Sequence, residues 1–352
     1  MESTERLCVL ELYSGIGGMY YTLKSSVPAE VVAAVYVNTT ANEIYKHNFP
    51  NTLLLPKTIE GMMLQDFDKL NFDVILMSPP CQPFTRIGLQ GDVADPRTKS
   101  FLYILELLPR LSKRPRFILL ENVKGFETSA ARDALLKTLR EFDYSFQEFL
   151  ISPTSLGIPN SRLRYFLIAR RPPGSFSFPT SAEIIEGFPM SESPNSLAVP
   201  HSHLTSSECE REKTGTIIFK LETEQELERK RIQDSQETVQ RLQDFLQEDE
   251  EGMDQYLLPP KTLLRYALLM DVVQPSSRRS VCFTKGYGHY VEGTGSVLQS
   301  CVHVELESVF KSLELSVLIV SKAWSGFVLS FPCCNSLYYF MNILCFNVKI
   351  LT

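Results

Sequence analysis

The chain has 352 residues, of which 44% are hydrophobic and 22% are charged, and its formal net charge at pH 7 is -6. This composition is that of a soluble globular protein with one large core or two unequal domains, and it excludes collagen-like, repetitive and uniformly cationic proteins. Any contact with RNA or DNA therefore needs a local basic face.

The cysteines and the N-terminus bear on the cellular compartment. Eight cysteines are spread along the chain without a CxxC pair or a zinc-ligand spacing. They are too sparse for a disulfide scaffold, so we expect a reducing compartment and no metal site. The acidic N-terminal residues lead directly into an apolar segment and lack the features of a targeting peptide. The sequence therefore predicts a cytoplasmic protein that is also compatible with the nucleus.

The first predicted elements are a strand and a helix joined by a glycine-rich turn. Residues 7–13 form an apolar run broken only by Glu11, as in a strand buried on both faces of a parallel sheet. Ser14-Gly15-Ile16-Gly17-Gly18 then turns the chain into a helix that begins at Met19. Glycines let the backbone approach a ligand, and a helix N-terminus can hold a carboxylate. By itself, the pattern fits a plain tight turn equally well.

A second strand is predicted at residues 31–37. It ends where nucleotide-binding α/β folds place an acid that binds the ribose hydroxyls, but the residue here is Tyr36. We expect this ring to pack on the sheet and the ribose contact to be weakened. A helix at about 40–48 follows, and then the segment Lys57-Thr58-Ile59-Glu60, which carries no signal as an isolated tetrapeptide.

The octet Ser78-Pro79-Pro80-Cys81-Gln82-Pro83-Phe84-Thr85 follows an apolar strand at 72–77. Its three prolines fix φ and remove three backbone donors, so neither a helix nor a strand ladder is expected to continue through Cys81. A thiol held in a stiff loop at a strand end is a candidate nucleophile. The alternative for an isolated cysteine is a buried structural role.

A candidate acid follows the next strand. A helical period over 98–111 predicts a helix that packs on the sheet, and the apolar strand 117–120 is followed by Glu121. A carboxyl at this place is either solvated or buried with a raised pKa. The cysteine loop at a neighbouring strand end favours the buried carboxyl.

Two arginines complete the set of candidate residues. After a predicted helix at 129–142 and a predicted strand at 144–151, Arg162 and Arg164 alternate along an extended segment. Alternate residues of a strand point to the same face. Two arginines on one face usually lie on a solvated strand edge, and they indicate a functional role only if a site lies beside them.

The octet around Cys81 resembles the signature of the cytosine-5 methyltransferases. From Leu7 to about Gln299 the chain is similar to the branch of that family that modifies aspartate tRNA, and Cys282-Phe283-Thr284 is a mark of that branch. The resemblance implies an α/β fold, with a Rossmann-like S-adenosylmethionine-dependent methyltransferase sheet and a smaller target-recognition domain. The expected boundaries are a catalytic domain at 1–170, a target-recognition region at 171–299 with a mobile segment at about 172–215, and a divergent apolar tail at 300–352.

The resemblance also implies roles for individual residues. Cys81 would be the nucleophile that adds to cytosine C6, Glu121 the protonated carboxyl that donates to N3, and Arg162 and Arg164 the pair that holds the base. S-adenosylmethionine would be the cofactor. The residues implied for cofactor binding are Tyr13, Gly15, Ile16, Gly17, Gly18, Tyr36, Ile59, Glu60 and Ser78.

The implied reaction is methyl transfer to C5 of cytosine 38 in the anticodon loop of tRNA-Asp, through a covalent Cys81 adduct. An unpaired loop offers the base without the cost of flipping it from a duplex. DNA is an alternative and weaker substrate, and we expect a monomer without membrane contact. A second alternative is a nucleic-acid-binding variant with impaired catalysis, which Tyr36 and the tail favour.

The resemblance ends at about Ser300, because the closing family motif around a Gly-Asn-Ser is missing. The segment from Ala323 to Val348 carries no charge and is long enough to span a bilayer. Three Asn, three Ser, one Gly and one Pro dilute its hydrophobicity. We therefore expect a core-filling or poorly folding tail rather than a membrane anchor.

Overall fold

The computed structural model describes residues 6–85, 91–187, 224–246, 257–259, 269–282 and 295–299, together with Thr262, Tyr266 and the backbone of 327–328. The described residues fall into two compact units, one within residues 1–188 and one within 189–330. Phe283, Thr284, most of the expected mobile segment and nearly all of the tail beyond 300 lie outside the described residues. Within the part of the chain that is described, no helix combines the length and apolarity needed to cross a bilayer.

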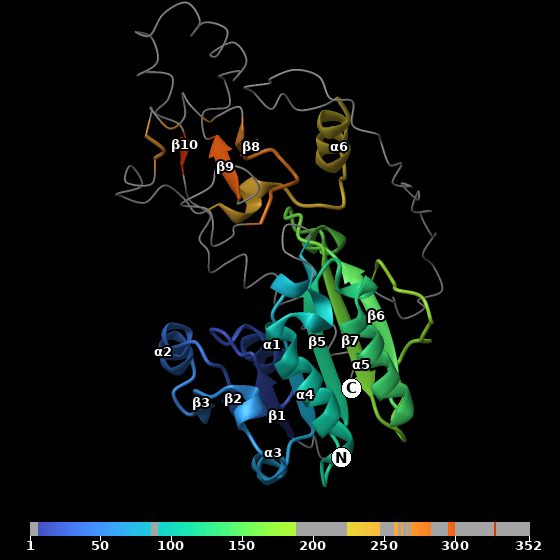
Figure 1. Ribbon diagram of the computed structural model, residues 1–352. Coiled ribbons are helices and arrows are strands. Elements are labelled where there is room, and N and C mark those ends of the chain that lie inside the picture. Colours follow the sequence, from blue (N-terminus) through green and yellow to red (C-terminus); the bar gives the residue numbers. More distant parts are fainter. Residues whose placement is uncertain are drawn as a thin grey trace, which may run out of the picture. The chain divides into compact units, whose positions relative to one another are not determined.

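The first unit is built on a seven-stranded sheet with the order β3-β2-β1-β4-β5-β7-β6 (Figure 1). Strands β1 to β5 pair in parallel, and β7 runs antiparallel between β5 and β6. This arrangement confirms the predicted α/β class. The strands are β1 (Leu7–Leu12), β2 (Ala29–Val35), β3 (Leu54–Leu55), β4 (Val74–Met77), β5 (Phe117–Val123), β6 (Ser145–Ile151) and β7 (Arg164–Arg170).

Helices cover both faces of this sheet. Side chains alternate along each buried strand, so Leu10 enters one apolar core and Val9 the other. The Leu10 side is covered by α3 (Leu64–Leu70), α4 (Lys99–Leu107) and α5 (Ala130–Glu141). The Val9 side is covered by α1 (Gly18–Ser26) and α2 (Thr39–Asn48). The three layers leave the ends of the strands as the places where polar groups can gather.

One strand is longer than the sequence predicted. Strand β5 continues to Val123, and Glu121 lies within it, opposite Phe166 of β7. The prediction that Glu121 follows the strand was therefore wrong by a few residues. The cause is the antiparallel neighbour β7, whose pairing extends the ladder beyond the last apolar residue, Leu120.

The second unit contains α6 (Glu224–Asp234) and a three-stranded sheet with the order β10-β9-β8. Strand β8 (Asp271–Val273) pairs in parallel with β9 (Ser296–Gln299), and β10 (Phe327–Val328) pairs antiparallel with β9. Arg279 is buried, and its Nη1 lies 2.7 Å from Asp271 Oδ1. Ser296 donates to the other oxygen of the same carboxylate. This buried ion pair ties the strands to the segment that precedes Cys282.

Candidate active site

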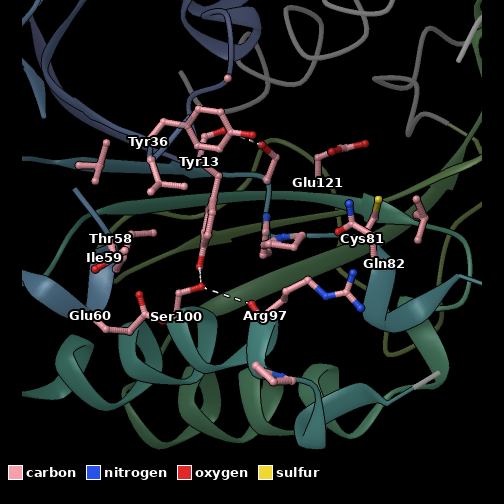
Figure 2. Close-up of a pocket in the computed structure, with 18 of the residues that line it drawn as sticks. Tyr13, Tyr36, Thr58, Ile59, Glu60, Cys81, Gln82, Arg97, Ser100 and Glu121 are labelled. Atoms are coloured by element: carbon pink, nitrogen blue, oxygen red, sulfur yellow. Dashed lines mark hydrogen bonds between the residues drawn. The ribbon is translucent and has the colours of Figure 1, made fainter. Parts of the chain in front are cut away.

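A cavity of about 640 Å³ lies at the carboxyl ends of β1, β2 and β4, beside β5 (Figure 2). It brings together residues that are far apart in the sequence. The predicted site residues that line it are Tyr13, Gly15, Tyr36, Ile59, Glu60, Ser78, Cys81, Glu121, Arg162 and Arg164. Ile16, Gly17 and Gly18 are not among its lining residues.

Cys81 is presented from the loop after β4. The parallel pairing of β4 with β5 sets the start of this loop beside the polar end of β5. The Phe84 amide donates to the Cys81 carbonyl (3.0 Å) and closes a single 3-10 turn at Gln82–Phe84. The prolines thus stop a longer helix but permit one turn. The Cys81 side chain is partly exposed and borders the cavity.

The end of β5 holds the cysteine loop in place. The Asn122 side chain is buried, and its Nδ2 donates to the Pro79 carbonyl (3.3 Å). Gly125 has φ +110°, and a Cβ added to it would lie 2.6 Å from the Phe84 carbonyl oxygen. The Phe84 ring packs edge-on against Phe126, with 5.0 Å between the ring centroids. These three contacts therefore fix the loop on both sides of Cys81.

Glu121 and Arg164 form an ion pair at the cavity wall. Arg164 Nε lies 3.2 Å from Glu121 Oε1, and the two side chains are 18% and 21% exposed. Burial raises the pKa of Glu121, although the charges of Arg164 and Arg162 oppose this shift. The carboxyl is therefore easier to protonate than an ordinary glutamate and can act as a hydrogen-bond donor.

Sequence reasoning missed Arg97, which also lines the cavity. Its Nε and Nη2 lie 2.9 and 2.6 Å from the two carboxylate oxygens of Asp95. The hydrogen bond to Asp95, together with the charge of that carboxylate, raises the pKa of Arg97. The available signal was Asp95-Pro96, a helix-start pattern in which the Asp95 side chain caps a short turn.

Tyr13 and Ser100 join two elements across the cavity. The Tyr13 hydroxyl donates to Ser100 Oγ (2.9 Å), as Figure 2 shows. The Tyr13 carbonyl accepts from Ser78 Oγ (3.3 Å). Tyr13 has φ +57°, a conformation that is unusual for a tyrosine. Burial raises its pKa, so the hydroxyl remains a donor. Ser100 was not predicted from the sequence, because its helix appeared purely structural.

Tyr36 differs from its expected placement. It lies just beyond the end of β2 and lines the cavity, so its ring is not a side chain packed within the sheet. Its carbonyl accepts from Asn42 Nδ2 (2.9 Å) of α2. The prediction that Tyr36 packs on the sheet was wrong, because the strand ends at Val35 and the next residue is already at the cavity.

The turn after β1 has the chemistry of a ligand-binding turn. Gly15 lines the cavity, and only the Tyr13 carbonyl, at 4.0 Å, comes near a Cβ added there. The neighbouring Ser14 Oγ is buried and has no hydrogen-bond partner within the described ranges. A buried hydroxyl without a partner is costly, and a polar ligand would satisfy it.

Comparison with known proteins identifies relatives that span most of the chain. The model of the C-5 cytosine-specific DNA methylase family matches residues 7–301, so the match ends where the sequence resemblance was expected to end. The mouse tRNA (cytosine(38)-C(5))-methyltransferase is 58% identical over 324 residues, which cover 88% of this chain and 78% of that protein.

Two crystal structures are similar in fold. The Dnmt2 methyltransferase of S. pombe superimposes with a TM-score of 0.69 at 28% identity, over 99% of this chain and 98% of that chain. A DNMT2 mutant of Spodoptera frugiperda superimposes with a TM-score of 0.67 at 34% identity, over 98% of this chain and 99% of that chain. Both likenesses extend over nearly the whole length of the chains compared.

The contact between Gly125 and the cysteine loop predicts a large cost for a small substitution. Gly125→Ala should destabilise the protein by about 2 to 4 kcal/mol, because it adds a Cβ in a left-handed conformation and forces it against the Phe84 carbonyl. Gly187→Ala is the matched control, since a Cβ there meets no atom of the described residues within 4 Å. Urea unfolding of both variants checks this, and equal stabilities would contradict the proposed packing.

Proposed function

The chain belongs to the C-5 cytosine-specific DNA methylase family, and from this premise we propose that it methylates C5 of cytosine 38 in a tRNA. We further propose that the substrate is tRNA-Asp and that the protein acts as a monomer in the cytoplasm or nucleus. The observation that carries the proposal is the cavity that Cys81, Glu121, Arg162 and Arg164 line together. The mouse relative, named as a tRNA enzyme, favours RNA over DNA as the substrate.

The residues around the cavity fit S-adenosylmethionine, which supplies an electrophilic methyl group when bound. The Ser14 hydroxyl, which has no hydrogen-bond partner among the described residues, and the turn at Gly15, which lines the cavity, suit the polar methionine end. Ile59 and Glu60, on the wall formed after β3, offer an apolar contact and an acceptor for the adenine. Tyr36 stands at the strand end where the ribose hydroxyls would lie.

Cys81 would activate the base by covalent addition. Cytosine C5 is a poor nucleophile until the Cys81 sulfur forms a bond to C6, which moves electron density to C5. C5 would then take the methyl group, whose bond to the sulfonium sulfur of S-adenosylmethionine breaks to leave a thioether, and a solvent water acting as base would accept the C5 proton. Elimination breaks the bond between sulfur and C6 and restores both the thiolate and the aromatic ring. Cys81 thus acts as the nucleophile and is regenerated at the end of the reaction.

Glu121 and the two arginines would stabilise the charged ring. A protonated Glu121 donates a hydrogen bond to N3, where negative charge develops when sulfur adds to C6. Arg164, held 3.2 Å from that carboxyl, and Arg162 would bind O2 and fix the orientation of the base. Burial of Glu121 supports this role, because it raises the pKa of the carboxyl and so favours its protonated, hydrogen-bond-donating form.

The covalent step gives the first test. RNA with 5-azacytosine at position 38 should form an adduct that survives denaturation, because elimination needs a C5 proton that this ring lacks. Cys81→Ala should abolish the adduct, and Cys282→Ala, which changes another partly exposed thiol, should leave it intact. An adduct that persists in Cys81→Ala would remove Cys81 from the mechanism.

The raised pKa of Glu121 predicts a pH dependence. The carboxyl donates only while protonated, so the single-turnover rate should fall as the pH rises through this raised pKa. Glu121→Gln carries an amide that donates at every pH, and it should be slower but lack this decline. Rates measured at successive pH values upward from about 4.3, the ordinary pKa of a glutamate, check the difference. A wild-type decline that survives unchanged in Glu121→Gln would assign it to another group.

Because Tyr36 stands where an acid would bind the ribose, we expect a lower affinity for S-adenosylmethionine than the same site would have with an acid. Tyr36→Asp should tighten S-adenosylmethionine binding by about 1.5 to 3 kcal/mol, roughly 10- to 150-fold, because a carboxylate there can accept from the ribose hydroxyls. Calorimetric titration of the wild type and of Tyr36→Asp gives the comparison, with Tyr36→Phe as a control for the loss of the phenol oxygen. Unchanged affinity in Tyr36→Asp would show that the ribose is held elsewhere.

A further inference from the structure

Glu11 is a buried acid that the proposed reaction does not use. It lies on β1 and is 1% exposed. Its Oε1 accepts from the Tyr20 amide (3.1 Å) and its Oε2 accepts from the Tyr45 hydroxyl (2.7 Å). Both described partners are neutral donors, and burial raises the pKa of Glu11 to about 7. A carboxyl is costly to bury in this way, so its presence requires a compensating role.

The role of Glu11 concerns the backbone amides at the start of α1. The first four amides of a helix have no partner within the helix, and they are usually satisfied by the N-cap side chain or by acids of the first turn. Here the N-cap is Gly17, and the first turn contains no acid. Glu11 accepts from Tyr20, the third residue of α1, and so caps this helix from the neighbouring strand.

The N-cap cannot carry a capping side chain of its own. Gly17 has φ +92°, and a Cβ added to it would lie 2.2 Å from a carbon of the Phe49 ring. That ring packs 4.2 Å from the Tyr20 ring and 5.1 Å from the Tyr45 ring, between centroids. The aromatic cluster of Tyr20, Tyr45 and Phe49 thus excludes every side chain at position 17, and a cap can come only from another element.

Tyr45 extends the arrangement to α2. Its side chain is fully buried, and its hydroxyl fixes the second oxygen of Glu11. Glu11 therefore links β1, α1 and α2 directly beneath the turn at Ser14–Gly18. Because one of the unpaired amides is occupied by Glu11, those at the very start of α1 remain for an external acceptor such as a carboxylate.

We propose that Glu11 is a positioning residue for the cofactor: by capping α1 from β1, it holds the Ser14–Gly18 turn in the conformation that receives the methionine end of S-adenosylmethionine. This inference rests on the proposed function. Glu11 is not among the residues that line the cavity, so it acts through the turn and not by contact with the ligand.

The test measures cofactor affinity separately from stability. Calorimetry at about pH 8, above the pKa of Glu11, gives the Kd of S-adenosylmethionine for the wild type, Glu11→Gln and Glu11→Ala. Glu11→Ala should raise this Kd by about 10-fold or more. Glu11→Gln keeps one oxygen for the Tyr20 amide and should recover most of the loss. In steady-state assays the KM for S-adenosylmethionine should rise while the KM for tRNA stays constant.

A buried carboxylate elsewhere in the same sheet serves as the control. Glu148 on β6 is 3% exposed and accepts two hydrogen bonds from Arg132, at 2.7 and 2.8 Å. Glu148→Gln should lower the free energy of unfolding without changing the Kd of the cofactor. If Glu11→Ala fails to fold, Tyr45→Phe keeps the ring and removes only the bond to Oε2, and it should raise the Kd by a few-fold.

Two results would overturn the inference. One is wild-type cofactor affinity in Glu11→Gln and in whichever of Glu11→Ala and Tyr45→Phe is folded. The other is an equal loss of affinity in Glu148→Gln, which would reduce the effect to general destabilisation. A wild-type protein that does not bind S-adenosylmethionine at all would instead contradict the proposed function, so the two failures are distinguishable.

Discussion

Strands β4 and β5 pair in parallel with Met77 opposite Leu120, and the placement of the cysteine loop beside Glu121 depends on that register. The residue after Met77 begins the cysteine loop, and the residue after Leu120 is Glu121. Pairing in this register sets Cys81, the proposed nucleophile, and Glu121 at the same end of the sheet, although about 40 residues separate them in the sequence. A shift of one residue in the pairing of β5 with β4 would turn the Glu121 side chain to the other face of the sheet.

Register alone does not fix a reactive group, and buried polar contacts complete the placement. The amide of Asn122 holds the loop before Cys81 through the Pro79 carbonyl, and Gly125 approaches the Phe84 carbonyl behind it. Glu11, within β1, does the same for the Ser14–Gly18 turn by accepting from the Tyr20 amide at the start of α1. In each case a polar or glycine residue inside or just after an apolar strand fixes a loop or turn that follows a strand of the same sheet. Such contacts give loops a rigid support without covering the cavity.

The sequence predicted those parts of the site that depend on local pattern. Prolines around Cys81 and glycines after β1 act within a few residues, so their turns can be read directly. Ser100 was missed because its placement depends on a contact with Tyr13, which lies far away in the sequence. Arg97 was missed although its partner Asp95 is local, because Asp95-Pro96 by itself marks only the start of a short turn. Glu11 looked like an interruption of an apolar run, since its partners Tyr20 and Tyr45 come from two later helices. The extent of β5 and the true position of Tyr36 likewise depend on pairing and strand length, which periodicity does not give.

The central claim is that this cavity methylates an unpaired cytosine of tRNA. The most direct measurement is single-turnover transfer of a labelled methyl group to a tRNA-Asp transcript, to the same transcript with uridine at position 38, and to duplex DNA. The account predicts transfer to the first transcript, little to the other two, and none by Cys81→Ala. Equal or faster transfer to duplex DNA, or transfer that persists without cytosine 38, would contradict it.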